Sequence, residues 1–91
     1  MSVKVQIPLP LRGSTGGLSE VEARGSNIRE IIGDLEASYP GIRERLFRGD
    51  EELNRFVSIF VGGRDIRLLE GLETTVREGD EITILPLAAG G

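Results

Sequence analysis

The chain has 91 residues and a formal net charge of −4, and it contains neither cysteine nor histidine. This composition excludes disulfides, thiol nucleophiles, imidazole bases and most zinc sites, so we expect neither a metal site nor a stand-alone hydrolase. There is no basic stripe, no signal peptide and no apolar run of ~18 residues, which favours a cytoplasmic domain that binds no nucleic acid and no membrane.

The N-terminal part of the chain predicts a β-hairpin. Apolar residues alternate along the first strand, at Val3, Val5, Ile7, Leu9 and Leu11. Pro8 and Pro10 cannot donate to a ladder, so pairing on both sides should fade after Ile7. A glycine-rich loop over 13–17 then leads to a weaker second strand with Leu18, Val21 and Ala23.

A single helix is predicted to follow. Ser26 and Asn27 are N-cap candidates, with Glu30 completing a capping box. Apolar residues recur at helical spacing, at Ile28, Ile31, Ile32, Leu35 and Tyr39. Gly33 is unfavourable in a helix, and close packing against a sheet would explain it. The helix should end at 40–41 and, with one apolar stripe, cover one face of the sheet.

The second half predicts three more strands. A helical turn over 42–46 and a solvated loop over 48–52 precede the strongest strand, residues 56–61. A Gly-Gly turn at 62–63 leads to a short strand from Asp65, then to a compact turn around Gly71 and a brief extended piece over 74–77. The final strand covers 81–85.

This order, β-β-α-β-β-β, predicts an α+β domain over residues 1–85 with the first and last strands parallel at the centre of a mixed sheet. Such a fold is a ubiquitin-like β-grasp roll, with one main helix packed on one face. Matching the helix stripe to alternate strand positions gives a predicted core of Val5, Ile7, Ile28, Ile31, Ile32, Leu35, Val57, Ile59, Val61, Ile82 and Ile84.

Residues 86–91 are expected to form a flexible tail. Pro86 stops the ladder, and small residues and Gly90-Gly91 follow. Six residues reach at most about 20 Å, so the Gly91 carboxylate would be a reactive group on a thin tether. Without a Cβ, the two glycines could enter a slot that excludes other residues. A frayed end is the alternative interpretation of this dipeptide.

Alternation along the strands also predicts a docking surface. If Val57 and Ile59 face the helix, then Phe56, Phe60 and Leu85 share the open face of the sheet, together with Ser58 and Thr83. A contiguous apolar patch beside the tail would bind partner enzymes. The alternatives are ordinary scattered apolar surface, or a segment 42–54 that folds over Phe56.

In its motifs, the chain resembles the prokaryotic sulfur carriers related to ubiquitin, the MoaD and ThiS group. Within that group it is most similar to the CysO-type carriers of cysteine biosynthesis. The resemblance covers nearly the whole chain and rests on Asp34-Leu35-Glu36-Ala37, Tyr39, Gly41, Arg55-Phe56-Val57, Ile59, Val61, Gly71-Leu72, Gly79-Asp80, Ile84-Leu85-Pro86 and Ala89-Gly90-Gly91.

The resemblance implies a carrier and not an enzyme. An ATP-dependent activating enzyme would adenylate Gly91, and a sulfur donor would displace AMP to leave a thiocarboxylate. The tail, residues Leu87, Ala88, Ala89, Gly90 and Gly91, would thread into the partner active sites. The acceptor would be a cysteine synthase-like enzyme acting on an aminoacrylate, and a metalloprotease would then release cysteine. The carrier itself would bind no cofactor.

The same resemblance leaves other roles open. The acceptor could instead be a molybdopterin synthase large subunit, or an enzyme of thiazole synthesis or tRNA thiolation. Gly91 could form isopeptide bonds with target lysines, as in a protein modifier. An interaction module with an inert tail is the remaining alternative.

Overall fold

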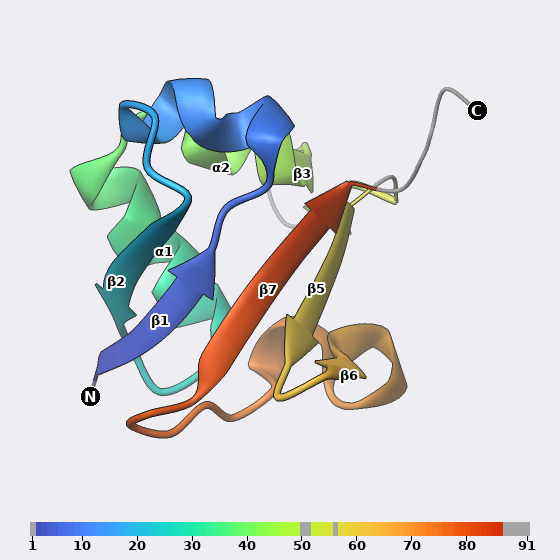
Figure 1. The fold of residues 1–91 in the computed structure, drawn as a ribbon. Coiled ribbons are helices and arrows are strands. Elements are labelled where there is room, and N and C mark those ends of the chain that lie inside the picture. Colours follow the sequence, from blue (N-terminus) through green and yellow to red (C-terminus); the bar gives the residue numbers. More distant parts are fainter. Residues whose placement is uncertain (1, 50–51, 56, 87–91) are drawn as a thin grey trace.

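The structure, a computed structural model, describes residues 2–49, 52–55 and 57–86. Its main sheet has five strands in the order β2-β1-β7-β5-β6. They are β1 (Ser2–Gln6), β2 (Glu20–Arg24), β5 (Val57–Val61), β6 (Arg64–Asp65) and β7 (Glu81–Pro86). As predicted, β1 and β7 lie parallel at the centre, and the other neighbours in this sheet are antiparallel (Figure 1).

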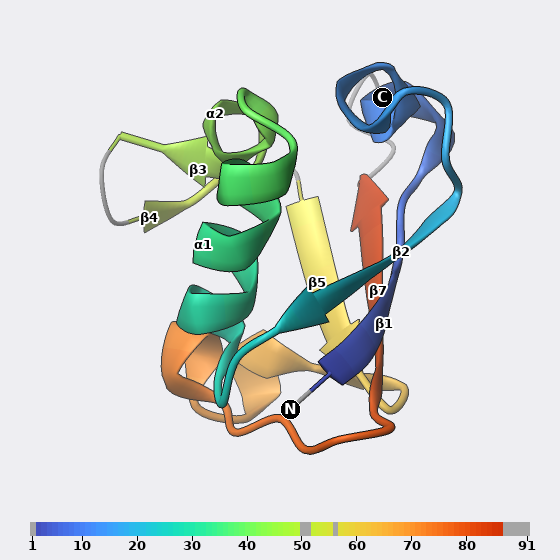
Figure 2. The ribbon, with the colours of Figure 1, turned by 90° about the vertical axis from the view of Figure 1, so that its left-hand side faces the viewer.

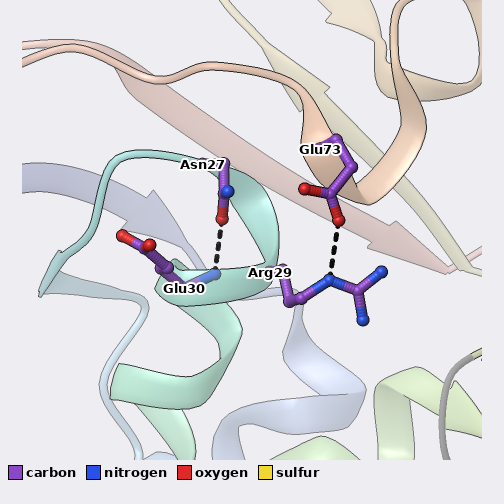
Figure 3. Close-up of polar contacts among 4 residues, drawn as sticks. All are labelled: Asn27, Arg29, Glu30 and Glu73. Carbon is purple, nitrogen blue, oxygen red and sulfur yellow. Dashed lines mark hydrogen bonds and ion pairs between the residues drawn. The ribbon is translucent and has the colours of Figure 1, made fainter.

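The main helix, α1 (Ile28–Ser38), packs against one side of this sheet (Figure 2). Asn27 is its N-cap, and the Asn27 side chain accepts a hydrogen bond of 2.8 Å from the Glu30 backbone N–H (Figure 3). This bond confirms the predicted N-cap, but the Glu30 carboxylate accepts from the N–H of Ser26, one residue before the N-cap, and so departs from the expected capping box. Arg29, on the same turn, forms a 2.8 Å ion pair with Glu73 in the 3₁₀ segment η3 (Gly71–Glu73).

The core lies between α1 and the sheet. Every predicted core residue is buried except Val61, which is half-buried. The short helix α2 (Ile42–Leu46) turns Ile42 and Leu46 inward, as predicted for this segment. Three other core residues, Phe47, Ile66 and Val76, lie at positions for which the sequence pattern predicted no burial.

The first strand is shorter than its alternating pattern predicted. The predicted fading of the pairing at the prolines is confirmed, since the registers with both neighbours end at Gln6, but residues Leu9–Thr15 form the 3₁₀ helix η1. Pro10 stands in its first turn, where a fixed φ suits a helix and a missing N–H costs nothing. Leu11 is therefore buried, whereas Leu9 is 73% exposed.

Three other segments differ from the prediction. The expected loop at 48–52 is flanked by a separate two-stranded sheet, β3 (Phe47–Arg48) with β4 (Glu52–Leu53). After β6 the chain turns at once into the 3₁₀ segment η2 (Ile66–Leu68), because the Asp65 side chain accepts a bond from the Arg67 N–H and caps it. The piece at 74–77 contributes only an isolated bridge to Asn27.

The explanation offered for Gly33 is wrong. Gly33 is exposed, and a Cβ built on it would have no atom within 4 Å. The close contact occurs instead at Gly25, just before the helix, where a Cβ would come within 2.8 Å of the Glu30 Cβ.

Candidate functional site

The point from which the tail departs is the end of β7. The predicted tail residues 87–91, with Gly91, lie outside the described residues, so their role stays a prediction. The last described residues, Leu85 and Pro86, stand opposite Ser58 and Val57 in the ladder between β7 and β5. The root of the tail, defined here as Leu85 and Pro86, is therefore held by the first residues of β5.

Phe60 on β5 and Leu85 on β7 occupy diagonal positions of the ladder between these strands, and we call this pair the apolar patch. Ile59, Ile82 and Ile84 are buried toward α1, so the alternate residues of β5 and β7 face the other side of the sheet. Leu85 is 45% exposed and Phe60 is half-buried. Phe56, the third predicted docking residue, lies outside the described residues.

Ser58 does not face solvent as predicted. It is only 5% exposed, because the guanidinium of Arg67 lies against it. Arg67 Nη1 donates to Ser58 Oγ at 3.4 Å, and Nη2 donates to the Val57 carbonyl at 2.7 Å. This role of Arg67 was not predicted. It depends on where β6 ends, and the sequence pattern did not indicate that position.

The β1 and β2 side of the same face is polar, with Lys4 and Arg24 among three glutamates. Lys4 stands between Glu22 on β2 and Glu81 on β7 in the strand register. Next to them, Gln6 Nε2 donates to a Glu20 carboxylate oxygen at 2.7 Å and to a Glu81 oxygen at 3.2 Å. A partner that lies across the whole face would therefore meet apolar contacts at the root of the tail, and polar groups with charges of both signs farther away.

Other classes of site find little support in this part of the molecule. Within residues 2–49, 52–55 and 57–86 there is no group of three acidic side chains placed to hold a metal ion. The helices in these ranges are also too short or too polar to cross a membrane.

Comparison with known proteins decides the family. The ThiS family model matches residues 5–91. The chain belongs to the ThiS family. A chain in the crystal structure of the Amycolatopsis orientalis BexX/CysO complex superposes with a TM-score of 0.92 at 47% identity, covering 98% of this chain and 99% of the other. This agreement shows that the architecture is the predicted β-grasp roll.

Two curated relatives bear on function. The sulfur carrier protein CysO of Mycobacterium tuberculosis is 47% identical over 93 aligned positions, which cover 100% of both chains. The small archaeal modifier protein 3 of Haloferax volcanii is 32% identical over 66 positions, covering 72% of this chain and 71% of the other.

Proposed function

We propose that this ThiS-family chain is a sulfur carrier protein that serves cysteine biosynthesis. The observation that carries the proposal is the 47% identity to the sulfur carrier protein CysO, which extends over the whole of both chains. Because the match is end to end, it supports a role for the Gly-Gly dipeptide at 90–91 as well as for the folded domain.

The chemistry proposed for Gly91 begins with activation of its carboxylate. An activating enzyme joins that carboxylate to the AMP part of ATP and releases pyrophosphate, so that AMP becomes the leaving group. A sulfide-equivalent donor then attacks the acyl carbon, the bond to AMP breaks, and a thiocarboxylate remains. This chain supplies the acyl group and the docking surface, and its partners supply the catalytic groups.

The tail and the apolar patch have separate parts in this proposal. Leu87, Ala88, Ala89 and Gly90 lead Gly91 into the active site, where the glycines let the chain pass a narrow slot. Phe60 and Leu85, with Phe56, provide the contact that holds the domain against each enzyme in turn. The crystal structure of the Amycolatopsis orientalis BexX/CysO complex supports the existence of a partner, because a related chain is bound there to another protein, and the contact residues named here are our proposal.

Intact-mass analysis of the protein purified from its own cells tests this function. We expect a fraction of the molecules to be heavier by the replacement of one oxygen by sulfur. Deleting Gly91 should abolish that fraction and leave the melting temperature unchanged, whereas Gly33→Ala, a glycine substitution remote from the tail, should keep it. A Gly91-deleted protein that still takes up sulfur would show that the tail is not the site.

Protein modification is the second candidate, favoured by the similarity to small archaeal modifier protein 3. In that case Gly91 would form isopeptide bonds with lysines of other proteins. An antibody against this chain would then detect high-mass species that survive boiling in detergent with thiol and that disappear when Gly91 is deleted. Sulfur uptake without such species would favour the carrier function alone.

A further inference from the structure

The side chain of Arg67 connects η2 to the first residues of β5. Its Nη2 donates to the Val57 carbonyl at 2.7 Å and to the Asn54 carbonyl at 3.3 Å, while Nη1 reaches Ser58 Oγ at 3.4 Å. Charged donors make stronger hydrogen bonds than neutral ones. The planar guanidinium therefore connects Asn54, in the turn before β5, with the first two residues of β5.

These contacts fall where the ladder of β5 is weakest. Pairing with β6 involves only Phe60 and Val61, so β6 does not extend to Val57. On the other side Val57 stands opposite Pro86, but its backbone N–H and carbonyl point away from β7, so this pair adds no ladder hydrogen bond. The Val57 N–H donates to the Asn54 carbonyl at 3.0 Å, and Arg67 provides the donor for the Val57 carbonyl.

The same residues of β5 hold the root of the tail. Val57 pairs with Pro86 and Ser58 pairs with Leu85, the last two described residues before position 87. We propose that Arg67 is a positioning residue that fixes the root of the tail, and thereby the point from which Gly91 reaches into a partner enzyme. This inference rests on the proposed carrier function and adds to it a residue outside the tail and the apolar patch.

Loss of Arg67 should affect the chemical step more than docking. Phe60, the patch residue that lies outside the root, still pairs with Thr83 and Asp65 when the first residues of β5 loosen, so part of the docking contact stays in place. The root, however, would sample several positions, and the Gly91 carboxylate would reach the reactive geometry less often. Misplacement by about 1 Å can cost up to ~100-fold in rate.

Hydrogen exchange tests the effect on the root directly. In Arg67→Ala, the amides of Ser58 and Leu85 should exchange about 10-fold faster, as expected when a charge-assisted hydrogen bond is lost locally. The amide of Ile82, at the other end of β7, should be unchanged. Arg64→Ala is the matched control, since Arg64 is an exposed arginine on the adjacent β6 and its removal changes the net charge equally.

Kinetics with the activating enzyme of the same organism, ATP and sodium sulfide test the functional effect. For Arg67→Ala we expect kcat to fall about 10-fold and KM for the carrier to change less than about 3-fold. Arg67→Lys should be intermediate, because an ammonium keeps the charge but lacks the fork that reaches three acceptors. Arg64→Ala should match the wild type.

Each result separates the role of Arg67 from the carrier function. Unchanged exchange at Ser58 and Leu85, or a kcat equal to that of Arg64→Ala, would overturn the positioning role. So would faster exchange at all amides with a lower melting temperature, which would indicate a global structural role. A wild-type protein that accepts no sulfur would contradict the carrier function, while the exchange data would still decide whether Arg67 fixes the root.

Discussion

The carboxylate of Glu36 accepts a 2.9 Å hydrogen bond from the backbone N–H of Arg43, and so joins the last turns of α1 to the start of α2. The Gly41 N–H donates to the same carboxylate at 3.1 and 3.2 Å. The bond from Arg43, followed by that from Gly41, lowers the pKa of Glu36 below its ordinary value of 4.5. Both bonds favour the ionised form.

This arrangement predicts a dependence of stability on pH. A carboxyl group whose pKa is lower in the folded than in the unfolded chain stabilises the fold fully above the unfolded value, and the contribution is lost as the pH falls through the folded value. The wild type should therefore lose stability below about pH 4.5. Glu36→Gln should lose less between pH 7 and pH 3, measured by urea unfolding. An equal loss would contradict this role of Glu36, and Glu44→Gln, an exposed change on α2, serves as the control.

Two glycines near α1 should respond in opposite ways to alanine. At Gly25 a methyl group would lie 2.8 Å from the Glu30 Cβ and 2.9 Å from the Ile31 nitrogen. Gly25→Ala should therefore lower the free energy of unfolding by about 1–3 kcal/mol. At Gly33 the methyl meets nothing within 4 Å, so Gly33→Ala should raise it by about 0.5–1 kcal/mol. Chemical denaturation measures the free energy of unfolding of both variants. Destabilisation by Gly33→Ala would mean that α1 packs more closely against its surroundings at this position.

Truncation of Ile32 tests the placement of the helix stripe. Ile32 lies on the buried face of α1 and is 2% exposed. Ile32→Ala should lower the free energy of unfolding by about 2–5 kcal/mol, through lost burial and the cavity left behind. Leu18→Ala provides the control, because Leu18 is 49% exposed and its truncation should cost less than about 0.5 kcal/mol. A cost for Ile32→Ala as small as that of the control would place this residue on the wrong face.

Local patterns were sufficient to predict the main architecture. The stripe from Ile28 to Leu35 and the cap at Asn27 each depend on residues within a few positions of one another, and both are confirmed. The parallel pairing of β1 with β7 also followed, because a crossover through a helix requires it.

The misses have other physical causes, one local and the rest long-range. Leu9 and Leu11 alternate like strand residues, yet the proline between them favours a 3₁₀ turn, and the sequence alone does not say which preference wins. The contacts of Arg67 with Val57 and Ser58 are long-range and depend on where β6 ends. The burial of Phe47 likewise depends on a hairpin that its short strands do not signal.

The apolar patch should carry partner affinity independently of fold stability. Leu85 is 45% exposed, so Leu85→Ala removes little core packing and should leave the melting temperature nearly unchanged. If the patch docks the activating enzyme, Leu85→Ala and Phe60→Ala should each weaken binding by about 1–2 kcal/mol in titration calorimetry. Phe60→Ala should also cost some stability, because Phe60 is half-buried.

The control for the docking experiment is Leu9→Ala. Leu9 is 73% exposed but belongs to η1 and lies outside the sheet, so its truncation removes apolar surface without touching the patch. Unchanged affinity in both patch variants would mean that the partner contacts another surface. Equal weakening in all three variants would show that general surface hydrophobicity, and not a defined patch, drives association. Only a loss of affinity confined to the Phe60 and Leu85 variants supports a docking site at the root of the tail. Leu85 stands opposite Ser58, the residue of β5 whose hydroxyl accepts a hydrogen bond from Arg67.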